Sequence, residues 1–187
     1  MRYFPLALAV PFFTANVESA PAADITLQDL DQFQIDVTDV TDRQVQLKGP
    51  PFSQRVTGNW QITVLGTSVA TDFYSVVSGP HGTHANPHHR GQFVIGEPKP
   101  VNSFGGGEGG WSFQAGTLTW VRTFGQGAYR LIVSFDRSAE GLKCNATASL
   151  ARENGTGAIR FKTEQGTDIK VLSTKTVSTN CSVKRPG

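Results

Sequence analysis

Hydrophobic and polar residues alternate along most of the chain after residue 59, in short runs separated by glycine, proline and asparagine. Alternation with a period of two, in runs rich in β-branched and aromatic residues, is typical of β-strands with one buried face. The pattern predicts strands at residues 60–65, 69–77, 92–95, 111–114, 117–124, 128–135, 143–150, 158–163 and 168–179.

Most neighbouring predicted strands are joined by only a few residues. Connections too short to hold a crossover helix require antiparallel neighbours. Leu131, Val133 and Phe135 form one apolar face, which a partner strand at 117–124 can meet across a turn at 125–127. We therefore expect an all-β fold, in which an antiparallel meander covers its apolar face by forming a sandwich or an up-and-down barrel. The pattern favours neither of these two forms.

The segment at 24–42 has a different pattern and a different charge. Its apolar residues recur every three or four positions, while Ile35 and Val37 alternate as in a strand, so we expect a short helical turn that leads into a strand. This acidic N-terminal arm holds six aspartates and no lysine or arginine, whereas the chain from Arg43 onward holds 16 basic and 8 acidic residues. The arm could fold onto the basic body or bind another molecule. The basic residues are scattered rather than interleaved with aromatic residues, which argues against nucleic acid as a partner.

Residues 1–23 have the pattern of a secretory signal peptide. One arginine precedes an apolar run at 3–13, and small residues follow at 20–22. The run is well short of the roughly 20 residues that span a bilayer. We expect cleavage before Ala23 or Asp24, a single β domain at 24–187, no transmembrane segment after cleavage, and a periplasmic or extracellular location.

The chain has two cysteines, Cys144 and Cys181, and we expect them to form one disulfide. A lone pair of cysteines in an exported chain is most simply explained in this way. Closing a loop of this length removes unfolded-state entropy worth roughly 3 to 4 kcal/mol in the chain-entropy model.

The four histidines, His81, His84, His88 and His89, all lie within the sequence GPHGTHANPHHRG at 79–91. Imidazole is a good ligand for zinc, copper and nickel, which suggests a transition-metal site. The glycines and prolines exclude a helix here and predict a flexible, polar surface loop, which metal binding would have to order. We therefore expect no cofactor, with zinc, copper or nickel on this loop as the alternative.

The sequence assigns no catalytic residue. A histidine that acts as a general base needs a nucleophile within reach, and the chain has no Gly-x-Ser-x-Gly motif. The glycine-rich segment 104–111 lacks the lysine of a phosphate-binding loop and reads as a connector. Of the tryptophans, Trp111 follows these glycines directly and is the best candidate for an exposed ring that binds a ligand, such as a sugar, by stacking.

One further set of residues lies in the last 130 residues or so: Trp111-Ser112-Phe113, Gly116-Thr117-Leu118-Thr119, Phe135, Cys144, Glu153-Asn154-Gly155-x-Gly157 and Cys181-Ser182. In these residues the chain resembles uncharacterised secreted β-rich domains of alphaproteobacteria. The resemblance implies an exported bacterial β domain and no particular chemistry. We expect a non-catalytic binding or structural module of the bacterial envelope, whose partner is an envelope component. The alternatives are a periplasmic transition-metal-binding protein that uses residues 81–89 and, third, an enzyme of unidentified class.

Overall fold

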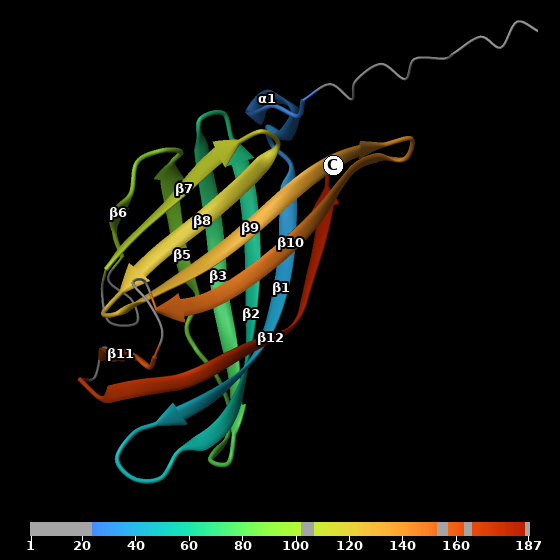
Figure 1. Cartoon of the computed structure of the whole chain (residues 1–187). Helices are drawn as coiled ribbons and strands as arrows, with labels where there is room; N and C mark the ends of the chain where they lie inside the picture. The colour runs from blue at the N-terminus through green and yellow to red at the C-terminus, as the bar shows by residue number, and fades with distance from the viewer. Residues whose placement is uncertain (1–23, 102–106, 153–156, 163–165, 186–187) are drawn as a thin grey trace, which may run out of the picture.

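The computed structural model describes residues 24–101, 107–152, 157–162 and 166–185, and most of these residues form antiparallel β-strands (Figure 1). The elements are α1 (Leu27–Leu30), β1 (Gln34–Gln46), β2 (Phe52–Leu65), β3 (Ser68–Gly79), β4 (Gly82–Ala85), β5 (His89–Val94), β6 (Lys99–Pro100), β7 (Glu108–Gln114), β8 (Thr117–Phe124), β9 (Gly127–Ser138), β10 (Gly141–Arg152), β11 (Ile159–Lys162) and β12 (Asp168–Lys184). The expected all-β fold is confirmed. Within these described ranges, no helix is long and apolar enough to cross a membrane.

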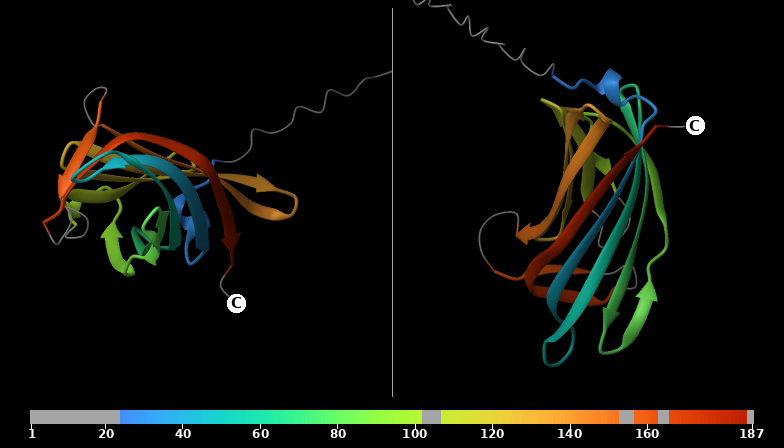
Figure 2. Two further views of the ribbon diagram at one scale, coloured as in Figure 1. Left: turned by 90° about the horizontal axis from the view of Figure 1, so that it is seen from below. Right: turned by 90° about the vertical axis from the view of Figure 1, so that its right-hand side faces the viewer.

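The strands form two sheets that face each other (Figures 1 and 2). Sheet A has the order β11-β12-β1-β2-β3-β4, with β5 also paired to β3, and sheet B has the order β10-β9-β8-β7-β6. Successive strands pair as an antiparallel meander within each sheet. Two departures from this order are β5, which pairs with β3, and β12, which pairs with β1 along the whole length of β1.

The hydrophobic core lies between the two sheets. Alternate residues of β1 and β2 point into it from sheet A, and alternate residues of β8 and β9 meet them from sheet B. Three tryptophans, Trp60, Trp111 and Trp120, pack against one another at its centre, with ring centroids 5.4 to 6.4 Å apart. The core thus fills the space between the sheets with large side chains.

The expectation that Trp111 is exposed is wrong, because its side chain is only 1% exposed. Trp111 lies opposite Trp120 in the ladder between β7 and β8. Gly109 lies two residues before Trp111 on strand β7, and a Cβ atom at this position would lie 2.5 Å from the Trp120 ring. This glycine makes room for a buried indole, so it does not mark a mobile connector beside an exposed ring.

The acidic arm is a central part of sheet A. The helical turn α1 leads into β1, as expected, and β1 lies between β12 and β2. Two of its aspartates on the outer face are neutralised by neighbouring strands: Asp36 pairs with Lys184 at 2.6 Å and Asp42 with Arg55 at 2.7 Å. The arm therefore folds onto the body of the domain.

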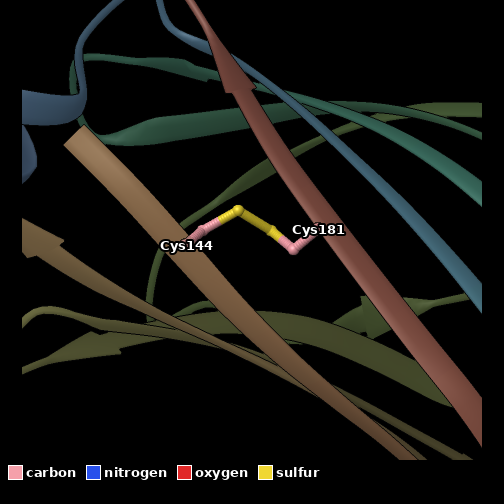
Figure 3. The surroundings of a disulfide bond; sticks show 2 residues. All are labelled: Cys144 and Cys181. Carbon is pink, nitrogen blue, oxygen red and sulfur yellow. A yellow bond between two sulfur atoms is a disulfide. The ribbon is translucent and has the colours of Figure 1, made fainter. Parts of the chain in front are cut away.

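The disulfide between Cys144 and Cys181 is present and joins the two sheets (Figure 3). It links β10 of sheet B to β12 of sheet A, with the two Cα atoms 5.8 Å apart. Further along the same strands, the Thr174 and Thr176 hydroxyls donate to carbonyl oxygens of β10 at 2.9 and 2.8 Å. Side chains and one covalent bond thus hold these two strands together where the sheets adjoin.

Candidate functional site

The segment that holds the histidines is not a flexible loop throughout. Residues 82–85 and 89–94 form β4 and β5, which pair with different parts of the long strand β3. Gly82 takes a positive φ of 103° in the tight turn between β3 and β4, a conformation that glycine adopts at little cost. The edge of β3 offers backbone partners to both segments, and this pairing outweighs the low strand propensity of their glycines.

These strands separate the four histidines. His84 lies opposite Val77 and His89 opposite Phe73 in the ladders of β3, while the His81 ring packs edge-on against Phe52. His88 lies on the other face of the sheet, beside Asp72. In the part of the chain that the structure describes, no group of three or more His, Cys, Asp or Glu side chains could hold a metal ion.

His88 instead belongs to a polar cluster on the outer face of sheet A. Its Nδ1 lies 2.8 Å from Asp72 Oδ1, and Arg90 donates from Nε to Asp72 Oδ2 at 2.8 Å. The imidazole also stacks on the Tyr74 ring, with centroids 4.5 Å apart. Partial burial raises the pKa of Asp72, but the hydrogen bonds from Arg90 and His88 outweigh it and hold that pKa below its ordinary value.

Strand register brings this cluster together. Asp72 and Tyr74 are two residues apart on β3, so both side chains point to the outer face, and Arg90 lies directly opposite Asp72 on β5. The sequence singled out His88 but not its three partners. The spacing of Asp72 and Tyr74 within a predicted strand was a usable indication that these two share a face.

Asp72 and His88 form a carboxylate–imidazole pair on the outer face of sheet A. A carboxylate within hydrogen-bond distance of an imidazole is half of the arrangement that a catalytic histidine requires. A catalytic histidine also needs a nucleophile or a substrate within reach, and the two cavities described below do not include Asp72 or His88. The His88 and Arg90 side chains are 53% and 78% exposed, so both present hydrogen-bonding atoms to solvent.

Polar side chains extend from this cluster across sheet A in two rows on its outer face. The ladders place them in rows that cross the strands: Ser182, Asp36, Gln61, Asp72 and Arg90 form one row, and Asn180, Thr38, Asn59 and Tyr74 form the next. Within the second row the Thr38 hydroxyl donates to Asn59 Oδ1 at 3.3 Å. These two rows therefore give the outer face of sheet A a polar area of amides, hydroxyls and charges at regular spacing.

At least two cavities open on the surface formed by the described residues. One, of about 620 Å³, lies between the α1 segment and the β9–β10 turn, and the Asp29–Arg137 ion pair lies at its edge. Hydrogen bonds from the Thr26 backbone and side chain, then from Arg137, lower the pKa of Asp29 to about 2. The other cavity, of about 650 Å³, involves β12, β1, β2 and the end of β3.

One further polar group, Asp39, is buried in the core. It is 2% exposed, and its Oδ1 accepts a hydrogen bond of 3.0 Å from the Tyr129 hydroxyl, which comes from sheet B. Gly58 lies opposite Asp39 on β2 and leaves room for the carboxyl group. Burial raises the pKa of Asp39, against the opposing effects of Tyr129 and the Arg43 charge. This enclosed contact joins the two sheets and is a structural link.

Comparison with protein families, curated proteins and solved structures adds no relative. No family model, no curated protein and no solved structure matches the chain.

Proposed function

We propose that the chain is an exported, non-catalytic binding module of the bacterial envelope, and that it binds its partner with the outer face of sheet A. The observation that carries this proposal is the contrast between the two faces of the sheet. Its inner face is packed against sheet B, whereas its outer face carries ordered rows of polar side chains around Asp72, His88 and Arg90.

Export is supported by the disulfide and by the sequence at the N-terminus. Disulfides form and persist in oxidising compartments such as the periplasm. The bond between Cys144 and Cys181 joins the two sheets, so it has a structural role in the fold. The disulfide and the signal-peptide pattern at 1–23 therefore both support export.

Binding is supported by the chemistry of the exposed groups. A guanidinium and several amides present donors and acceptors from the strands of sheet A, and the His88 imidazole lies beside them, directly before β5. Groups that are held in place lose little entropy when a ligand binds. A catalytic role has less support, because the Asp72–His88 pair lies outside both described cavities.

Export can be tested by expressing the full chain in a Gram-negative bacterium. We expect the protein in the periplasmic fraction, with a mature N-terminus at Ala23 or Asp24 by mass spectrometry and no free thiol after denaturation. Cytoplasmic protein with two titratable thiols would contradict export.

Binding can be tested by recording amide NMR spectra of the isotope-labelled mature protein with three probes: oligogalacturonate, cellotetraose and inorganic phosphate. We expect at least one saccharide to shift amides of β1, β2, β3 or β5 on sheet A. Shifts confined to sheet B would contradict the assignment of the face. No shift with any of the three would contradict saccharide binding.

A further inference from the structure

The cavity of about 650 Å³ is a groove that crosses the strands of sheet A. Two rows of side chains on the outer face form its walls. One wall consists of Lys175, Asp42, Arg55 and Ser78, which are successive cross-strand partners, and the other consists of Ser173, Gln44 and Ser53.

The row between these walls is Arg43 with its cross-strand partners Gln54 and Thr174. Side chains in this row point to the inner face, because successive residues of a strand alternate between faces. The Thr174 hydroxyl accordingly donates to the Leu150 carbonyl of sheet B, and the Arg43 charge acts on the buried Asp39. The backbone of this row therefore forms the floor of the groove.

The charged wall is positive overall. Arg55 donates from Nε and Nη2 to the two carboxylate oxygens of Asp42, at 2.7 and 3.0 Å, and this pairing raises the pKa of Arg55. Lys175 lies opposite Asp42 on the other side and is exposed. One carboxylate thus lies between two cations, so an incoming anion meets an excess of positive charge and competes with Asp42 for Arg55.

The opposite wall is neutral and rich in hydrogen-bonding groups. Gln44 donates from Nε2 to the Ser53 hydroxyl at 2.6 Å, which fixes both side chains in place. Strands lie about 4.8 Å apart, so the charged wall, which spans four strands, is roughly 14 Å long. The groove therefore offers charges on one side and neutral donors and acceptors on the other, at a regular spacing.

We propose that this groove binds a segment of an acidic polysaccharide, in which sugar carboxylates meet Lys175 and Arg55 and sugar hydroxyls meet Gln44 and the serines. None of the described residues that line the groove is aromatic, so a neutral sugar finds no ring there on which to stack, and charge with hydrogen bonding carries recognition. This inference rests on the proposed function, since it names the ligand class for the outer face of sheet A.

The experiment is calorimetric titration of the mature protein with tetragalacturonate at low ionic strength. We expect Lys175→Gln to weaken binding by roughly twofold to fivefold, the range that an exposed ion pair provides. Asp42→Asn should instead tighten binding, because it removes a like charge and releases Arg55 for the ligand. Lys162→Gln is the matched control: it removes one positive charge from an exposed residue of β11, outside the groove, and should leave the affinity unchanged.

Opposite effects of the Lys175 and Asp42 substitutions support a specific groove, since a general loss of folding would weaken binding in both variants. Equal weakening by Lys175→Gln and Lys162→Gln would show non-specific attraction to a basic protein and would overturn the proposal. So would a wild-type protein that does not bind tetragalacturonate.

Amide shifts distinguish failure of the groove from failure of the proposed function. If a saccharide shifts the amides around Asp72 and His88 but not those around Arg55, the proposal for the groove is wrong, and the proposal that the outer face of sheet A binds the partner is supported. If no saccharide shifts any amide on the outer face of sheet A, the ligand class fails for the whole face.

Discussion

Replacing both cysteines by serine tests how far the junction between the sheets depends on its covalent bond. The disulfide closes a loop of 37 residues between β10 and β12. In the double variant Cys144→Ser/Cys181→Ser, the Thr174 and Thr176 hydroxyls still reach the carbonyl oxygens of β10, so we expect the native sheets to remain in contact. The principal change is then in the unfolded state, which gains the freedom that the bond removes.

The loop length sets the expected magnitude. In the chain-entropy model, a loop of this length is worth about 4 kcal/mol at 25 °C. With an m-value in urea near 2 kcal/mol/M, within the usual range for small proteins, the unfolding midpoint of the variant falls by about 2 M.

Equilibrium urea unfolding of the mature protein, followed by tryptophan fluorescence, measures this difference. Wild-type protein unfolded in a reducing agent is the control, and it should match the double variant. A loss below about 1 kcal/mol with an unchanged m-value would refute the loop-closure reasoning, because it would mean that the bond hardly restricts the unfolded chain.

Further predictions concern the buried polar contact and the histidines. Gly58→Ala should lower the free energy of unfolding by about 1 to 3 kcal/mol in urea, because the new Cβ would lie 2.5 Å from Asp39 Oδ1; unchanged stability would contradict the fit of the carboxyl group. Tyr129→Phe should lower it by a similar amount, about 1 to 3 kcal/mol, because the buried carboxyl group loses the hydrogen bond from the Tyr129 hydroxyl, whereas an unaffected variant would mean that water replaces the hydroxyl. The pKa of Asp39 is raised in the folded protein, so protonation of Asp39 stabilises the fold at pH values below the ordinary pKa of 3.8. This contribution to the free energy of unfolding is lost as the pH rises through the raised pKa, and urea unfolding of Asp39→Asn over the same pH range should not show the loss. Elemental analysis of the purified mature protein should find no stoichiometric zinc, copper or nickel, and a bound equivalent that disappears in His88→Ala/His89→Ala would restore the metal-binding alternative.

The sequence predicted those strands in which alternation was strong and turns were marked by glycine. The prediction of 117–124 agrees with β8, and 128–135 lies within β9, because both strands have alternating apolar residues around a tight turn. It did not predict that β12 pairs with β1. Pairing between the two ends of a chain leaves no local pattern, since it depends on how the whole meander closes.

The candidate site was less predictable, because register decides which side chains meet. His88 and Asp72 are 16 residues apart, and only the ladder between β3 and β5 brings them together. Glycine has two structural roles here that the sequence alone does not distinguish. Gly109 makes space for a buried tryptophan, and Gly82 permits a turn between paired strands. Interpreting both as flexible connectors gave the wrong expectation for Trp111 and for the histidine segment.

A crystal structure of the mature protein soaked with tetragalacturonate tests the central claim most directly. The account predicts saccharide density across β12, β1 and β2, with carboxylate oxygens at hydrogen-bond distance from Lys175 Nζ and the Arg55 guanidinium. Density on sheet B, or an outer face of sheet A left empty at saturating saccharide, would contradict it.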